Sequence, residues 1–429
     1  MELHPRRLLP ILQARLARWP VTVLTGARQT GKTTLVRELL PAMETTAPAY
    51  LSLDDPDERL RLAQDPVRRL DYGTRLVILD EVQKQPALLD VVKFLADRKR
   101  GHRFLLLGSS QIRLLHHVRE TLAGRATLLD LWPLGLVERV TGPEAPPCGL
   151  DRIWQEGEAA LHRMTTAGVP TEHIRTWRTH AEESLRWGGY PALALLPEAE
   201  RPVWFRDFRK TYLERDLADL GRVADLDQFA LAQNLLAART GQLLSYSEVS
   251  RDLGVVVNTV KRYLRFLEIS YQVVLLRPWG PSVGTRLVKS PKVYWTDPGL
   301  ARLLAERPNL DDGPFFETYL CDELVRWMSW QVEPAALQFY RTAAGREVDF
   351  VLHAGRGLVA MEAKASQRAH ATDARALTEI VTAWRSPGLH PDAWRIGLVV
   401  TRGREIEPLA PHVWAIPDWR LFGPSPDES

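Results

Sequence analysis

The sequence predicts an α/β protein whose N-terminal domain is a parallel β-sheet with helices on both faces. Three observations lead to this prediction. Short apolar runs alternate with helical segments over the first 140 residues, a glycine-rich loop follows the first run, and polar residues follow the third and fourth runs. Ligands of such sheets bind beside the carboxyl ends of the strands. The chain has 429 residues, too many for one core, so we expect two to four domains.

The strands expected in this sheet are short runs rich in β-branched and aliphatic residues, with helical stretches between them. They are residues 21–25, 50–54, 76–80, 103–108 and 126–131.

The loop after the first strand has the spacing Gly26-x-x-x-x-Gly31-Lys32-Thr33, which is that of a phosphate-binding P-loop when a strand precedes it and a helix follows. The glycines let the backbone wrap closely, so that successive N–H groups point at phosphate oxygens. Lys32 is expected to reach the β- and γ-phosphates, and Thr33 to coordinate Mg²⁺. The sequence therefore predicts a P-loop NTPase with ATP and Mg²⁺ as cofactors. The predicted phosphate-binding residues are Gly26, Ala27, Arg28, Gln29, Thr30, Gly31, Lys32, Thr33 and Thr34.

Polar residues after two later strands complete the predicted nucleotide site. Asp80 ends the apolar run "LVILD" and is expected to hold the metal through water, whereas Glu81 is expected to orient and activate the attacking water. Ser109 and Gln111 follow the strand 103–108, where a polar tip can sense the γ-phosphate. The alternative for that tip is a simple serine turn.

The chain resembles the predicted bacterial AAA+ ATPases that carry a second C-terminal domain. The resemblance rests on the segments "GARQTGKTTL", "VILDEVQ", "LLLGSSQ" and "ETLAGRA", and extends over nearly the whole chain. It implies a homo-oligomer, with a hexameric ring as one form, in which an arginine completes the neighbour's site. Arg125 is the best-placed candidate because a strand begins just beyond it; the alternative is a structural or solvated arginine.

The resemblance and the composition together divide the chain. The AAA+ core is expected at residues 1–140, because the stretch "TGPEAPPCGLDR" that follows is rich in proline and glycine. A linker and a helical lid, implied by the resemblance, are expected at residues 141–225. A winged-helix domain is expected at residues 226–304, where a short helix, a second helix capped by Asn258 and an alternating strand follow one another.

The segment from Arg251 to Lys292 carries most of the positive charge. It holds eight Lys/Arg and two Asp/Glu, a net charge of +6 in a chain whose total is +3. Such a local excess is typical of a surface that contacts nucleic-acid phosphates. The alternative is a packing module whose charges are merely solvated. The predicted DNA-binding residues are Lys261, Arg262, Arg265, Arg286, Lys289 and Lys292.

The last region is expected to contain a helix over 315–330, three short strands, a helix and a further strand. Glu347 and Asp349 are two residues apart on one strand, and Glu362 and Lys364 are two apart on the next, so each pair projects from one face. If the two strands form a hairpin, Asp349 and Glu362 can bind a divalent metal. Lys364 can then position a water against a phosphodiester.

This arrangement resembles the PD-(D/E)XK nuclease fold, with Asp349 followed thirteen residues later by Glu362-Ala363-Lys364. Glu317, on the first helix, matches an additional acidic residue of resolvase-like members. The resemblance implies a restriction-endonuclease-like α/β domain at residues 305–429, with Glu317, Asp349, Glu362 and Lys364 as its catalytic residues. The alternative is a structural salt-bridge cluster.

The predicted function is ATP hydrolysis coupled to the binding and processing of duplex or branched DNA, with a metal-dependent nuclease domain as a further possibility. The alternative is an ATP-dependent signalling or defence switch whose C-terminal domain binds DNA or protein without cleaving. No apolar run approaches membrane-spanning length. The two cysteines, Cys148 and Cys321, stand far apart and fit a reducing compartment, so a cytoplasmic location is expected.

Overall fold

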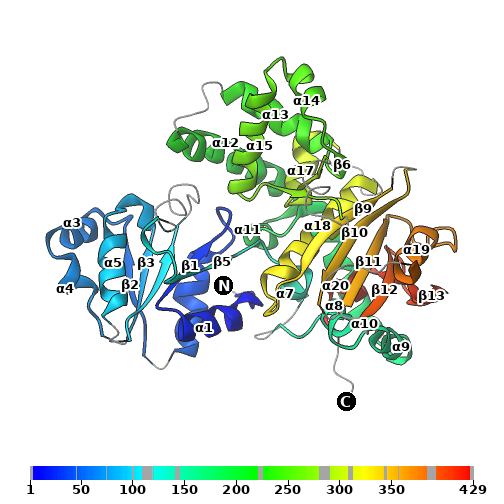
Figure 1. The fold of residues 1–429 in the computed structure, drawn as a ribbon, viewed down its shortest axis with the longest axis horizontal. Helices are drawn as coiled ribbons and strands as arrows, with labels where there is room; N and C mark the ends of the chain where they lie inside the picture. Colours follow the sequence, from blue (N-terminus) through cyan, green and yellow to red (C-terminus); the bar gives the residue numbers. More distant parts are fainter. Residues whose placement is uncertain are drawn as a thin grey trace.

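The structure is a computed structural model with three parts, an N-terminal domain, a middle module and a C-terminal domain (Figure 1). Among the residues it describes, no helix is long and apolar enough to span a membrane. The described residues are 3–44, 46–73, 75–98, 101–108, 118, 120–140, 145–220, 226–279, 290–307, 313–342, 345–355, 357–383 and 393–425.

The N-terminal domain is a five-stranded parallel sheet in the order β2-β3-β4-β1-β5, which confirms the predicted α/β core. Every residue of β1 and of β3 is buried, as expected for strands covered on both faces. Helices α3 to α5 pack on one face, and α1 with the helical stretch after the P-loop packs on the other. The elements are α1 (Leu8–Arg18), β1 (Val21–Thr25), α2 (Lys32–Thr34), η1 (Leu35–Leu39), η2 (Leu40–Met43), β2 (Ala49–Ser52), α3 (Pro56–Gln64), α4 (Pro66–Leu70), β3 (Leu76–Asp80), η3 (Val82–Lys84), α5 (Leu88–Asp97), β4 (Arg103–Leu107) and β5 (Ala126–Asp130).

The middle module, residues 191–305, lies above the other two parts in Figure 1 and has its own hydrophobic core. Its small sheet has the order β6-β8-β7, with both pairs antiparallel. Its elements are α11 (Pro191–Leu195), η4 (Glu198–Glu200), α12 (Arg201–Leu220), α13 (Leu226–Ala238), β6 (Gln242–Leu243), α14 (Tyr246–Leu253), α15 (Val257–Ile269), β7 (Val273–Leu276), β8 (Lys292–Trp295) and α17 (Pro298–Ala305).

The C-terminal domain is a six-stranded mixed sheet in the order β13-β14-β12-β11-β10-β9. Strands β10 and β11 form the predicted antiparallel hairpin, and β12 pairs with β11 in parallel. The elements are α18 (Gly313–Ser329), β9 (Ala336–Arg341), β10 (Glu347–Ala354), β11 (Gly357–Lys364), α19 (Arg375–Ala383), β12 (Trp394–Thr401), β13 (Glu407–Ala410), β14 (Val413–Pro417) and α20 (Asp418–Phe422).

The helices that follow the ATPase core pack differently from the expected lid. Helices α8 (Gly149–Glu156), α9 (Glu158–Thr166) and α10 (Thr171–Trp187) share one apolar core with α18, α20 and the C-terminal strands. Figure 1 shows them beside β12, away from the P-loop sheet. Trp154 of α8 packs edge-on against Trp327 of α18 and against Trp394 of β12, with ring centroids 5.4 and 5.5 Å apart.

A buried ion cluster joins the C-terminal domain to the end of the ATPase core. Arg326, on α18, is 1% exposed and pairs with Asp322 and Glu323. It also donates to the Leu134 carbonyl at 2.8 Å, and Glu323 accepts from the Leu136 N–H at 3.0 Å at the start of α7 (Leu136–Val140). These buried ion pairs and hydrogen bonds join α18 to the segment after β5 and so hold the two parts together.

Candidate functional site

The P-loop follows β1 with the backbone that its glycines allow. Gly26 has φ +147°, and a Cβ there would lie 2.2 Å from the Leu131 carbonyl oxygen. Gly31 has φ +90°, in the region that favours glycine. Lys32 is buried, and its ammonium donates to the carbonyls of Gly26 at 2.9 Å and Ala27 at 2.6 Å. The lysine thus points into the loop that it is predicted to serve.

Arg6, a residue that the sequence analysis did not single out, holds this loop from outside. Its guanidinium is buried and donates to the Thr30 carbonyl at 2.8 Å, to the Trp132 carbonyl at 2.5 Å and to Glu138 at 3.3 Å. All three partners are distant in sequence, so no local pattern marks the role. Arg6 positions the P-loop relative to the end of β5.

The predicted metal-binding residues of the ATPase domain lie together. The Thr33 hydroxyl is 3.4 Å from Asp80 Oδ2, and the Tyr50 hydroxyl donates to the same oxygen. Burial and the hydrogen bond to Asp80 raise the pKa of Tyr50, which keeps it a donor. A hydroxyl and a carboxylate that converge beside a P-loop fit the oxygen ligands that Mg²⁺ prefers.

Glu81 follows Asp80 in the left-handed backbone conformation, with φ +56°. Non-glycine residues rarely adopt this conformation, and strain of this kind is concentrated at functional sites. The backbone N–H of Glu81 donates to Asp80 at 2.9 Å, and its carboxylate accepts from Gln83. The conformation places the Glu81 carboxylate just beyond the end of β3. The other predicted residues at this edge, Ser109 and Gln111, lie outside the described residues.

Arg125 lies at the amino end of the parallel strands, whereas the P-loop lies at their carboxyl end. It immediately precedes β5, whose first residue pairs with Val21, whereas the P-loop begins after Thr25. Four residues of strand separate the two levels by roughly 13 Å. Within the chain, Arg125 pairs with Asp97 at 2.6 Å and lowers the pKa of that carboxyl through the hydrogen bond. A role in ATP hydrolysis therefore requires the site of another subunit.

An apolar pocket of about 110 Å³ adjoins the P-loop. It brings together the N-terminal segment, the start of the helical stretch after the loop, and α11 of the middle module. Burial and the charge of Arg139 lower the pKa of His4, so its imidazole is neutral at pH 7. The lining residues are Leu3, His4, Arg6, Gly31, Thr34, Leu35, Leu39, Leu134, Pro191, Ala192 and Leu195.

Tyr271 connects the middle module to the strand that leads into the P-loop. It lies in the turn between α15 and β7, has φ +60° and is 5% exposed. Its hydroxyl lies 2.8 Å from Thr25 Oγ1 and donates to Asp130, while its ring packs edge-on against Trp132. Thr25 immediately precedes Gly26, so this contact reaches the base of the loop.

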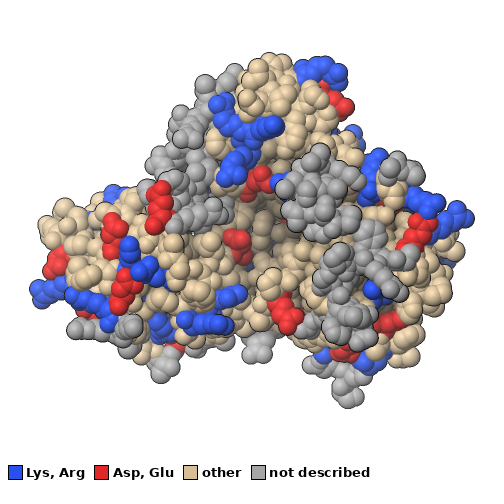
Figure 2. All heavy atoms as spheres, viewed as in Figure 1, with Lys and Arg blue, Asp and Glu red and all other residues tan. Residues whose placement is uncertain are grey.

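The predicted DNA-binding residues separate into three groups. Lys261, Arg262 and Arg265 are exposed on α15, and Figure 2 shows basic side chains gathered over this part of the module. Arg286 and Lys289 lie outside the described residues. Lys292 is 3% exposed, so a phosphate of duplex DNA cannot reach it. Its predicted DNA contact is contradicted by this burial.

The C-terminal domain brings the predicted acidic residues together, as expected from the hairpin. Asp349 Oδ2 accepts from the Ala363 N–H at 2.9 Å, and Glu362 pairs with Lys364 at 3.0 Å. Glu317 reaches the same cluster from α18. Burial, together with the negative charge of Asp349, raises the pKa of Glu317 to about 8 and that of Glu362 to about 7.

Lys292 enters this cluster from β8 of the middle module. Its ammonium lies 2.7 Å from Glu317 and 3.2 Å from Asp349, and it also pairs with Glu347. Burial lowers the pKa of Lys292, but the charges of Asp349 and Glu317 outweigh this effect and raise it, so the lysine stays charged. Among the described residues, no group of three or more His, Cys, Asp or Glu is arranged to hold a metal ion. In this arrangement the cluster does not fit a divalent metal.

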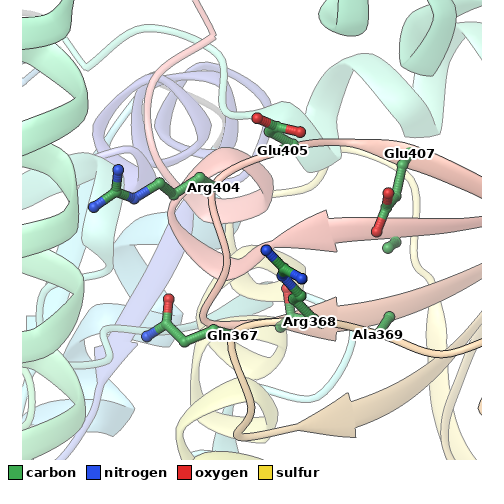
Figure 3. A pocket seen from close by; sticks show the side chains of 8 residues that line it. Gln367, Arg368, Ala369, Arg404, Glu405 and Glu407 are labelled. Carbon is green, nitrogen blue, oxygen red and sulfur yellow. The ribbon is translucent and has the colours of Figure 1, made fainter.

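A second, polar pocket of about 590 Å³ lies at the carboxyl ends of β11 and β12. Figure 3 shows that its charged side chains do not converge, since Arg404 points away from Glu407. Without convergent charges it has no built site for an anion. Its lining residues are Gln367, Arg368, Ala369, Thr401, Arg404, Glu405, Glu407 and Ala415.

The fold and the P-loop define an AAA-type P-loop ATPase domain, and the family described as "AAA domain" matches residues 18–140. Two further families match the remainder. They are described as "Domain of unknown function (DUF8612)", over residues 178–311, and "Domain of unknown function (DUF4143)", over residues 312–421.

Two mycobacterial relatives cover most of the chain. They are the uncharacterized proteins Rv2008c of Mycobacterium tuberculosis and Mb2031c of Mycobacterium bovis. Each is 34% identical over 349 residues, which are 79% of this chain and 68% of the relative. The chain belongs to the same family as these proteins.

Similar solved structures are more distant. The Walker-type ATPase PABY2304 of Pyrococcus abyssi is 15% identical, with 71% of this chain and 99% of that chain covered and a TM-score of 0.42. The RuvB Holliday junction branch migration motor of Thermotoga maritima is 16% identical, with 62% and 87% covered and a TM-score of 0.29. Similarities at this distance do not assign a function.

Substitution of the P-loop lysine tests the nucleotide site. We expect Lys32→Ala to lower ATP turnover by at least about 100-fold, because the charge aimed at the phosphates is lost. Lys84→Ala is the matched control, since Lys84 is in the same domain and its side chain is 44% exposed in an ion pair with Asp54. Phosphate release and binding of a fluorescent ATP analogue measure the effect. Equal turnover in the two variants would contradict the assignment.

Proposed function

We propose that the protein hydrolyses ATP with Mg²⁺ and couples the turnover to duplex or branched DNA bound by the middle module. The observation that carries this proposal is the contact of Tyr271 with Thr25 and Asp130. This contact joins the middle module, which carries the exposed basic helix, to the strand that enters the P-loop. A movement of the module can therefore change the position of the P-loop strand, and the reverse, through packed and hydrogen-bonded groups.

Residues of the ATPase domain have distinct roles in the proposed reaction. Lys32 binds the β- and γ-phosphates, Thr33 and Asp80 hold Mg²⁺, and Glu81 orients the attacking water in line with the leaving group. When bound there, Mg²⁺ would neutralise charge on the phosphates. Arg125 of a neighbouring subunit adds positive charge at the γ-phosphate, because Arg125 is too far from the P-loop of its own chain. Ser109 and Gln111 remain the predicted γ-phosphate sensors.

The apolar pocket beside the P-loop is the proposed base-binding site. Gly31 and Thr34 line both the pocket and the loop, so a nucleotide whose phosphates lie in the loop can place its base there. The lining is mostly aliphatic, and the neutral imidazole of His4 supplies a polar contact. Because α11 forms one wall, base binding also contacts the middle module.

The proposed DNA surface is α15. Val260, Leu264 and Leu267 are buried on one side of the helix, which leaves the basic side chains to solvent. Together with the order of helices and strands around it, this arrangement supports the winged-helix interpretation, in which a helix enters the major groove. The basic residues on this surface are Lys261, Arg262 and Arg265.

The nuclease interpretation is not part of this proposal. Asp349, Glu362 and Lys364 do lie together, but the Lys292 ammonium occupies the acidic cluster. A second candidate function is the ATP-dependent switch. It is favoured by the pairing of Arg125 with Asp97, because a single chain then has no Arg125 at its own nucleotide site. DNA-stimulated turnover separates the two, because a switch would hydrolyse ATP slowly with or without DNA.

The central experiment measures ATP turnover with linear, forked and four-way DNA. We expect Lys261→Ala/Arg262→Ala/Arg265→Ala to weaken DNA binding and to reduce its salt dependence by a slope of about 2–3, because each lost phosphate contact accounts for about 0.9. Stimulation of turnover should fall in parallel. Arg61→Ala/Arg68→Ala/Arg98→Ala is the control, since it removes the same charge from exposed positions of the ATPase domain. Equal loss in both variants, or no stimulation of the wild type by any DNA, would contradict DNA coupling.

The contact between the module and the P-loop strand predicts a separation of binding from stimulation. Tyr271→Phe keeps the ring against Trp132 and removes only the hydroxyl. We expect unchanged DNA affinity and a roughly 5-fold smaller stimulation of turnover, the equivalent of one hydrogen bond of about 1 kcal/mol. Tyr246→Phe, on α14 of the same module, is the control. If Tyr271→Phe is stimulated like the wild type, the coupling does not pass through this hydroxyl.

The position of Arg125 predicts complementation between two inactive variants. Arg125→Ala and Lys32→Ala are each expected to be inactive. An equal mixture should recover about a quarter of the wild-type rate, the fraction of neighbouring pairs that combine an intact loop with an intact arginine. Phosphate release after mixing measures this recovery. A fully active Arg125→Ala variant, or no recovery from two folded variants, would argue against a shared site.

A further inference from the structure

We propose that Lys292 is a built-in cation of the C-terminal acidic cluster, and that it excludes a divalent metal while β8 stays docked against α18 and β10. The proposal concerns a residue of the middle module, outside the stretch that carries the nuclease-like residues. It does not depend on ATP turnover or on DNA binding.

The contacts of Lys292 are those of a bound cation. Its side chain is 4% exposed, and carboxylates approach it from two elements, Glu317 from α18 and Glu347 and Asp349 from β10. The Tyr294 hydroxyl, two residues along β8, donates to Glu317 as well. An ammonium surrounded by three carboxylates is satisfied in both charge and hydrogen bonding, which is the condition for burying it.

Both carboxylate oxygens of Asp349 already have a partner in the protein. Oδ1 accepts from the Lys292 ammonium at 3.2 Å, and Oδ2 accepts from the Ala363 N–H at 2.9 Å. A divalent cation on Oδ1 would lie next to the ammonium, and two positive charges this close repel strongly in a poorly solvated site. Metal and lysine therefore compete for the same carboxylate.

The charge balance of the cluster points the same way. Its acidic members are Glu317, Glu347, Asp349 and Glu362. Its basic members are Lys292, Lys364 and Arg341, the last paired with Glu347 at 3.2 Å. Removal of Lys292 would take away the one cation that Glu317 and Asp349 share, and carboxylate oxygens without a counter-charge attract a divalent cation.

Lys292 is held in place by the sheet of the middle module. It is the first residue of β8 and pairs with Leu243 of β6 and Leu276 of β7. Just beyond β7, the Trp279 N–H and the Phe339 carbonyl join the module to β9 by a hydrogen bond at 2.5 Å. The backbone of Lys292 is therefore held beside the C-terminal sheet while these contacts are kept.

Titration of the full-length, nucleotide-free protein with Mn²⁺ tests the proposal, with free Mn²⁺ followed by electron paramagnetic resonance. We expect the wild type and Asp349→Asn to bind Mn²⁺ alike, because in both proteins Lys292 occupies the acidic cluster and keeps the metal out. Lys292→Met should gain one site per chain, at least about tenfold tighter than any wild-type site. Lys292→Met/Asp349→Asn should lose it. Lys210→Met, which removes an exposed lysine of the same module, should resemble the wild type.

Stability provides the second readout. Lys292→Met should unfold at a lower temperature than the wild type, because carboxylates are left without their counter-charge, and Mn²⁺ should restore part of the loss. If Lys292→Met does not fold, Lys292→Gln keeps a hydrogen-bond donor and is titrated in its place. A wild-type Mn²⁺ site that Asp349→Asn removes would overturn the proposal. A folded Lys292 variant that gains no Mn²⁺ site would overturn it as well.

Discussion

The close approach of Gly26 to Leu131 is the constraint on which the nucleotide site depends. There is no space for a side chain between the end of β1 and the segment after β5, and the Thr25 carbonyl accepts there from the Leu131 N–H at 2.8 Å. The loop therefore turns directly off the sheet. Its lysine lies under the loop, and its threonine faces the carboxylate at the end of β3. The other groups of the site are arranged around this turn.

The middle module is placed to connect two chemically different sites. At one end of β7, Tyr271 touches the strand that enters the P-loop; on the neighbouring strand, Lys292 enters the acidic cluster. Both contacts are buried and polar, so each requires a specific geometry, and a buried group that loses its partner destabilises the fold. A shift of the module would alter both contacts. Tyr271 directly follows α15, and its N–H donates to the Glu268 carbonyl of that helix at 3.0 Å, so a shift of α15 would alter the first contact as well.

Local patterns were sufficient for much of the fold. The strands of the first sheet follow from apolar runs, the loop follows from glycine spacing, and the hairpin of Asp349 and Glu362 follows from alternation along two strands. The predictions that failed concern residues whose partners are distant in the sequence. The charge of Lys292 is visible in the sequence but its burial is not, since its carboxylate partners lie 25 or more residues away.

The same reason explains the other misses. Arg6 acts through partners 24 to 132 residues away in the chain, and Tyr271 through partners 141 and 246 residues away, so no short window of sequence reveals them. Helices α8 to α10 follow the ATPase core as a lid would, but their apolar faces match the C-terminal sheet. These helices are next to the ATPase core in sequence but pack in space with the C-terminal domain, which the chain enters again only after the middle module.

The placement of Lys292 on β8 has a consequence for dissection of the protein. A fragment that starts at α18 would contain every residue of the nuclease-like motif but would lack the lysine that neutralises it. Its carboxylates would face solvent and attract whatever cations the buffer supplies. Chemistry found in such an excised piece would then describe an unmasked surface and not the behaviour of the intact chain.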